Sequence, residues 1–95
     1  MIKSFANEIT ERIFQGIHTH TIRKEFPQGV IRQAERRLDI LNSVQDLESL
    51  TLIPSMKAEA AVRDSHGKYS IPLMEGWRIA FRWNHENAED VEIKE

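Results

Sequence analysis

The stretch Trp77-Arg78-Ile79-Ala80-Phe81-Arg82-Trp83 carries the clearest structural signal in this chain of 95 residues. Large apolar side chains alternate along it with charged or small ones, which is the period of a β-strand with one buried face. Burial of one large apolar side chain contributes about 1.5–3 kcal/mol, so the face with Ile79 and Phe81 can anchor a small domain. The opposite face of the same strand presents Arg78 and Arg82.

The residues on either side of this strand predict the rest of a small sheet. Apolar residues occupy every second position of the segment 69–73. Met74-Glu75-Gly76 then joins that segment to the strand at 77–83 as a tight antiparallel hairpin. Val91 and Ile93 predict the beginning of a last strand, after a polar turn over residues 84–90.

Two segments in the first half of the chain have helical spacing instead. The apolar residues of the first segment are Ile9, Ile13, Phe14 and Ile17. Asn7 is its predicted N-cap and Gly16 its predicted end. The second helix is predicted over residues 28–42, because Pro27 suits the start of a first helical turn and an apolar stripe follows. The short connection between the two predicts a hairpin of helices.

Weaker patterns predict two further short strands, one at Met1–Ser4 and one at Leu50–Ile53. The chain has no internal repeat and no linker-like stretch. Helices first and consecutive antiparallel strands later are typical of the α+β class. We therefore predict a single domain over residues 1–95, with an N-terminal helical hairpin packed on a small twisted, mainly antiparallel sheet.

Composition excludes several classes of protein. Hydrophobic residues make up 40% and charged residues 29% of the chain, which is typical of a globular domain. With 0 Cys there is no disulfide framework or thiolate metal site, which favours a cytoplasmic location. No apolar run approaches the roughly 18 residues that a membrane span needs. The net charge is -2, but residues 1–83 hold 12 bases against 10 acids, so a local basic patch is compatible with it.

The face of the predicted sheet opposite the core is rich in charge. Its members are Lys68, Ser70, Arg78, Arg82, Glu92 and Lys94. Arg78 and Arg82 would stand about 13 Å apart at the usual strand rise, with the small Ala80 between them. This arrangement predicts either a shallow floor for an anion or a solvated face whose arginines pair with Glu92 or Glu75. The polar segment 57–68, which enters the hairpin directly, would lie beside it.

Other motifs for chemistry are missing from the sequence. There is no phosphate-binding loop, no dinucleotide fingerprint and no nucleophile elbow. His18 and His20 are wrongly spaced for one helix face, so no metal site and no cofactor are expected. A basic cluster on the helices is diluted by acids and predicts a solvated helix face, with partner binding there left open. Its members are Arg23, Lys24, Arg32, Arg36 and Arg37.

Two stretches carry a family resemblance. The opening Met1-Ile2-Lys3-Ser4-Phe5 and the string Tyr69-Ser70-Ile71 … Gly76-Trp77-Arg78-Ile79-Ala80-Phe81 resemble HigB-like toxins of the RelE/ParE toxin superfamily, also called plasmid-maintenance killer proteins. The order and spacing are similar over essentially the whole chain, and Val91-Glu92-Ile93 fits the last strand of that family.

The resemblance implies the toxin of a type II toxin–antitoxin system. Such toxins enter the ribosomal A site and cleave mRNA there without a cofactor. Their usual partner is a helix-turn-helix, HigA-like antitoxin, with which they form a hetero-oligomer. RNA supplies its own nucleophile, the 2′-OH, so the protein needs a proton acceptor, a cation for the charge on phosphorus and a proton donor.

The family pattern assigns expected roles to particular residues. Arg78 occupies the Trp-Arg position and would stabilise the phosphate, for which a bidentate guanidinium is well suited. The usual lysine before the hairpin is replaced by Val62, so Arg63 or Lys57 would substitute for it. Glu95 falls on the Asp of the family's terminal Asp-Tyr-His.

Three further residues, His66, Lys68 and Arg82, complete the expected site. Glu95 or His66 would accept a proton, and His66 and Lys68 would contact RNA. Lys57 and Arg82 would attract the RNA backbone. The Tyr and His of the family's ending have no counterpart in this sequence, which predicts attenuated cleavage. Two alternatives remain open: a ParE-like toxin that inhibits DNA gyrase and cuts nothing, and an inactive relic that only binds its antitoxin.

Overall fold

The stretch 77–83 lies in the middle of a three-stranded antiparallel sheet in the computed structural model, which describes residues 1–53 and 67–95. The described strands are β1 (Tyr69–Pro72), β2 (Arg78–Asn84) and β3 (Asn87–Lys94), in the order β1-β2-β3. The 3-10 turn η3 (Met74–Gly76) joins β1 to β2. The predicted hairpin and its apolar face are thus confirmed.

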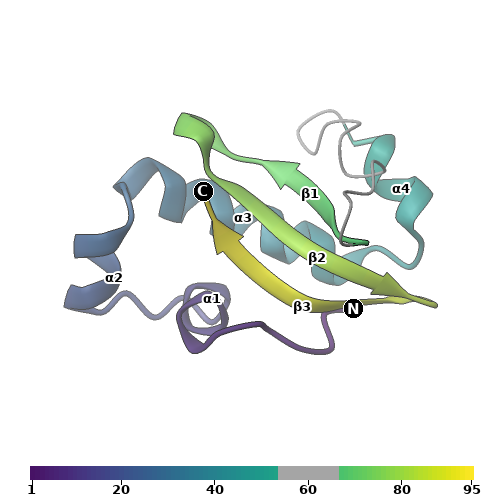
Figure 1. The fold of residues 1–95 in the computed structure, drawn as a ribbon, viewed down its shortest axis with the longest axis horizontal. Helices are drawn as coiled ribbons and strands as arrows, with labels where there is room; N and C mark the ends of the chain where they lie inside the picture. Colours follow the sequence, from purple (N-terminus) through teal and green to yellow (C-terminus); the bar gives the residue numbers. More distant parts are fainter. Residues whose placement is uncertain (54–66) are drawn as a thin grey trace.

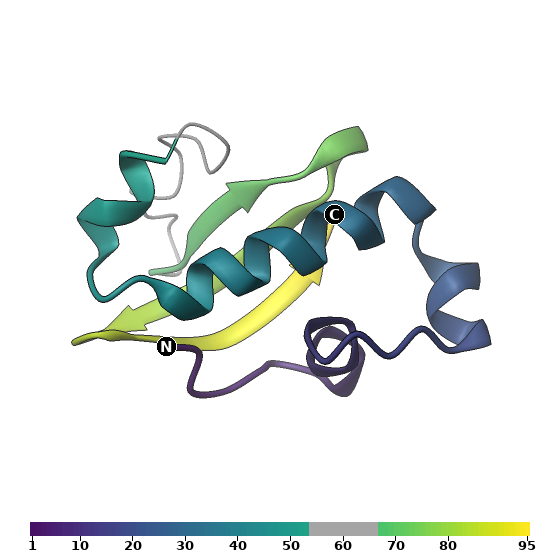
Figure 2. The same cartoon turned by 180° about the vertical axis from the view of Figure 1, so that it is seen from behind.

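The helices occupy one side of this sheet. They are α1 (Glu8–Phe14), α2 (His20–Glu25), α3 (Gln28–Ser43) and α4 (Leu47–Thr51). Figure 1 shows α3 behind the sheet, and Figure 2 shows it crossing in front from the other side. The molecule is therefore an α+β fold with N-terminal helices packed on a three-stranded antiparallel sheet, and no described helix crosses the near face of the sheet in Figure 1.

The core lies between α3 and the sheet. Phe81 is its largest fully buried side chain, with Leu38 and Leu41 of α3 buried in the same cluster. The ring of Tyr69 stacks on that of Phe81, with centroids 5.9 Å apart. The rings of Trp83 and Phe81 pack edge to face, with centroids 6.4 Å apart. The predicted core face of the central strand thus does form the core of the domain.

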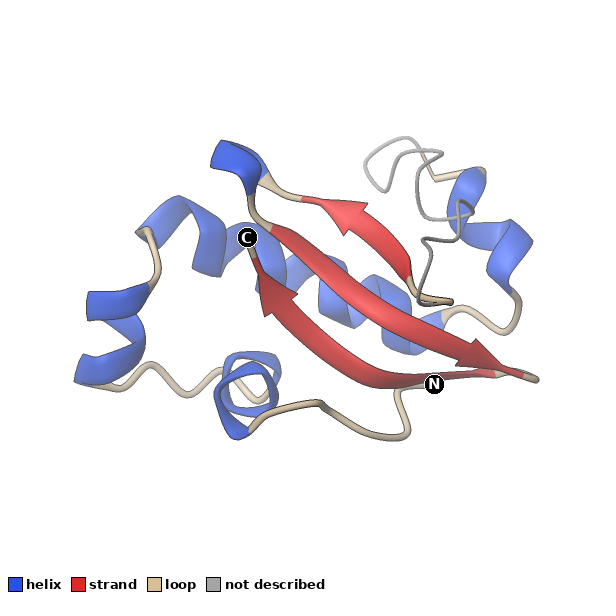
Figure 3. Ribbon diagram, viewed as in Figure 1, coloured by secondary structure: helices blue, strands red, loops and turns tan. Residues whose placement is uncertain are grey.

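The N-terminal segment covers the outer edge of β3. It runs parallel to this strand and makes isolated bridges at Ile2 and Phe5, as the loop beside β3 in Figure 3 shows. Its carbonyl groups accept hydrogen bonds from the amides of Ala88 and Val91. An uncovered sheet edge is a template for aggregation, so this segment protects β3 without forming the regular strand predicted at Met1–Ser4.

A β-bulge changes the register of β3. Ala80 pairs with Glu92, but Arg82 pairs with Glu89, so β3 has one residue more than β2 between these pairs. The extra residue lets Ala88 and Val91, three positions apart, both point into the core. The last strand therefore begins at Asn87, and the prediction that it begins at Val91 after a turn over 84–90 was wrong.

The predicted strand at Leu50–Ile53 was also wrong. The chain forms α4 there, and the Asp46 carboxylate caps this helix by accepting a hydrogen bond from the Ser49 amide at 2.8 Å. The predicted helical hairpin differs too. A third helix, α2, interrupts the connection, and α1 is seen end-on where α3 lies lengthwise, so these two helices cross (Figure 1).

The turn between β1 and β2 is held to α3. The Gln33 side chain accepts a hydrogen bond from the Met74 amide at 2.7 Å, and the Arg37 guanidinium donates to the Pro72 carbonyl. Partial burial lowers the pKa of Arg37 from its ordinary value, and the neighbouring Arg36 lowers it further. These contacts fix the hairpin that carries Arg78 at the start of β2.

Candidate functional site

We use the name outer sheet face for the surface of the sheet turned away from α3. Strand alternation and register place there the side chains of Lys68, Ser70, Pro72, Arg78, Ala80, Arg82, Glu89, Glu92 and Lys94. Ala80 is buried beneath its longer neighbours. Charged side chains therefore surround the small Ala80 on this face, as the alternation of residues along the strands predicted.

Two of the cations on this face have acidic partners. The Nζ atom of Lys68 lies 3.9 Å from Oε1 of Glu92. The Nε atom of Arg82 lies 3.3 Å from Oδ2 of Asp90, a residue of the bulge. The second pair is about half exposed on both sides, and exposed pairs of this kind contribute about 0–1 kcal/mol. The predicted pairing of arginines with Glu92 or Glu75 is not seen among the described residues. Glu92 forms its ion pair with Lys68 instead, and Arg82 forms its ion pair with Asp90.

Arg78 and Lys94 form the unbalanced part of the outer sheet face. They are directly opposite each other in the register of β2 and β3, and both are partly exposed. Neither makes an ion pair or a side-chain hydrogen bond with any residue of the described ranges. Like charges directly opposite each other on a sheet are destabilising, so this corner favours an added anion.

The remaining predicted site residues fall into two groups. Glu95 is exposed and directly follows Lys94, so it lies at the same corner of the sheet as Arg78. Lys57, Arg63 and His66 lie outside the described residues. The structure thus brings together part of the predicted set, at the end of β3.

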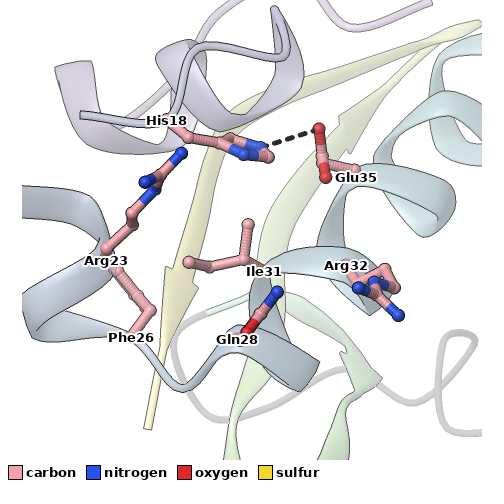
Figure 4. Close-up of a pocket in the computed structure, with 7 residues that line it drawn as sticks. All are labelled: His18, Arg23, Phe26, Gln28, Ile31, Arg32 and Glu35. Carbon is pink, nitrogen blue, oxygen red and sulfur yellow. Dashed lines mark ion pairs between the residues drawn. The ribbon is translucent and has the colours of Figure 1, made fainter. Parts of the chain in front are cut away.

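A second candidate region was not predicted from the sequence. A cavity of 510 Å³ opens between α2, α3 and the connection that precedes α2 (Figure 4). Arg23 and Arg32, which belong to the basic cluster seen in the sequence, stand on its wall. Sequence patterning misses it because the cavity depends on the turn of the chain through α2, a helix that the apolar spacing did not reveal.

The described residues contain neither a cluster of metal-ligating side chains nor a membrane-spanning helix. Within residues 1–53 and 67–95, no three His, Cys, Asp or Glu side chains gather where they could hold a metal ion. No helix in the same ranges is long and apolar enough to cross a membrane. No known protein-family model matches the sequence, and no curated protein is significantly similar to it.

Proposed function

We propose that this protein is a toxin of the HigB-like type, which binds mRNA on the ribosome and cleaves it through the RNA 2′-OH. The sequence resemblance in the hairpin, with Arg78 at the Trp-Arg position, motivates the proposal. One structural observation supports it most: Arg78 and Lys94 stand opposite each other on the outer sheet face, and neither is ion-paired with a negative charge from any described residue. A phosphate of the RNA backbone would supply that charge.

The reaction needs no redox partner and no metal. A proton acceptor removes the 2′-OH proton, the oxygen attacks the adjacent phosphorus, and the bond to the 5′-oxygen of the next nucleotide breaks. That oxygen leaves with a proton, and a 2′,3′-cyclic phosphate remains. Arg78 would stabilise the added negative charge on the phosphate oxygens, and Lys94 would reinforce it. Glu95, at the same corner, is the proposed proton acceptor among the described residues.

Mapping of mRNA ends tests this function. The protein is added to a bacterial translation reaction, and the new 5′ ends on a defined mRNA are counted. We expect cuts within translated codons and a rate about 10²–10³ lower for Arg78→Gln, as for the loss of one transition-state donor. Lys24→Gln is the matched control, because Lys24 is an exposed cation on α2, away from the sheet.

The outcome separates the proposal from its alternative. Intact mRNA together with a DNA-damage response after expression in cells would replace it with a ParE-like inhibitor of gyrase. Equal cleavage by the wild-type protein and Arg78→Gln would remove Arg78 from the mechanism. The proposal also includes a helix-turn-helix antitoxin as inhibitor, and a small gene of that kind directly downstream would support it.

A further inference from the structure

The cavity bounded by α2 and α3 has an apolar floor and a polar rim. Phe26 and Ile31 form the floor, with only 8% and 4% of their surface exposed. Arg23, Gln28 and Arg32 stand around it as exposed side chains. Figure 4 shows Arg23 and Arg32 on opposite sides of Ile31, so a molecule resting on the floor would have a cation on each side.

The charge around this cavity is not balanced. Among the described residues that line it, the one carboxylate is that of Glu35, which lies 3.0 Å from the Nε2 atom of His18. Neither Arg23 nor Arg32 has an ion pair or side-chain hydrogen bond with any residue in the described parts of the chain. The rim therefore offers two free guanidinium groups, each of which can hold a phosphate through two parallel hydrogen bonds.

We propose that this cavity binds a mononucleotide-like ligand, which is an aromatic ring joined to a phosphate group. Its 510 Å³ lies within the range of about 300–1,000 Å³ for small-molecule sites. The ring would lie on Phe26 and Ile31, and the phosphate would meet a guanidinium of the rim. The Gln28 amide and the Glu35 carboxylate add donors and acceptors for the edge of a base. This site is separate from Arg78 and does not depend on the proposed RNA cleavage.

Trp77, which lies against one residue of the floor, is a natural reporter of binding. The ring of Phe26 packs against Trp77, with centroids 4.8 Å apart. A ligand on the Phe26 floor therefore alters the surroundings of the Trp77 indole. The chain has 2 tryptophans, so Trp83→Phe leaves Trp77 as the single indole N–H signal in an NMR spectrum.

Titration of this Trp83→Phe protein with three probes tests the proposal. The probes are adenosine monophosphate, which has both parts, adenosine, which lacks the phosphate, and inorganic phosphate, which lacks the ring. We expect adenosine monophosphate to shift the Trp77 signal saturably, and each of the other two to bind at least about tenfold more weakly. Equal binding of inorganic phosphate, or no shift with any probe, would overturn the proposal.

Charge-removing variants locate the bound phosphate. Arg23→Gln and Arg32→Gln should each weaken adenosine monophosphate binding by about tenfold or more, since each removes a charge-assisted contact. Lys24→Gln is the control, because Lys24 is on α2 beside Arg23 but does not line the cavity. Loss of binding in Arg78→Gln with no effect of Arg23→Gln and Arg32→Gln would move the ligand to the outer sheet face and refute this site.

Discussion

Replacement of Thr10 by valine should destabilise the whole domain, although valine is the more apolar residue. Thr10 is only 1% exposed, and its hydroxyl oxygen accepts a hydrogen bond from the Ile93 amide at 3.1 Å. Valine has the same shape but no acceptor, so the buried amide is left without a partner, which costs about 1–3 kcal/mol. A domain of this size has a free energy of unfolding of about 5–14 kcal/mol, so the loss is substantial.

Urea unfolding measures this loss, and a serine variant controls it. At about 1–2 kcal/mol per molar urea, Thr10→Val should lower the unfolding midpoint by roughly 1 M. Thr10→Ser keeps the acceptor and loses one methyl group, worth about 0.8 kcal/mol, so it should be the more stable variant. Hydrogen exchange at the Ile93 amide should accelerate in Thr10→Val more than in Thr10→Ser. A valine variant as stable as the wild-type protein would show that the hydrogen bond contributes nothing.

Three further changes test the turn between β1 and β2, the N-cap of α4, and the hydrogen bond that holds the hairpin to α3. Gly76 has φ near 80° and open space where a Cβ would lie, so Gly76→Ala should lower the free energy of thermal unfolding by about 1–2 kcal/mol through backbone strain alone. Hydrogen bonds from the Ser49 hydroxyl and amide lower the pKa of Asp46. The cap of α4 should therefore be intact above the ordinary aspartate value of about 3.9 and be lost as the pH falls through the lower folded value. The Ser49 amide NMR signal reports this transition, which Asp46→Ala should abolish. Arg37→Met keeps the aliphatic stem but removes the donor to the Pro72 carbonyl, so chemical denaturation should show a loss of about 1–3 kcal/mol, and an unchanged midpoint would exclude that bond.

The hairpin of β1 and β2 was predictable because its signal is local. Alternation of apolar residues over 77–83 predicts the strand and its buried face, and Met74-Glu75-Gly76 predicts the turn. The helix α3 was predictable for the same reason, since its apolar stripe is long enough to establish a period. The resemblance to a toxin family, by contrast, concerns function, and it stays a prediction.

Short elements were missed because their apolar residues do not establish a period. Leu50–Ile53 suits a strand or a buried helical turn equally well, and the signal that separates them is the cap at Asp46, three residues before Ser49. Thr19 likewise caps α2, which the apolar spacing alone does not reveal. The charge partners on the outer sheet face were unpredictable for another reason: they depend on the register of β3.

The bulge in β3 connects the core with the candidate site. If the pairing of Arg82 with Glu89 continued without a shift, Arg78 would face Ile93 and Ala80 would face Val91, so two core residues would point outward. One extra residue at this point turns both of them inward. Asp90 takes a positive φ there, which aspartate tolerates better than most residues.

The same shift moves Lys94 onto the outer sheet face, directly opposite Arg78. The register that buries Val91 and Ile93 in the core therefore also places Lys94 beside Arg78. A glutamate at position 94 would satisfy the core equally well and would remove the repulsion, so packing does not explain a lysine there. The phosphate of the proposed function would explain it, because the repulsion in the free protein would become attraction once an anion lay between the two cations.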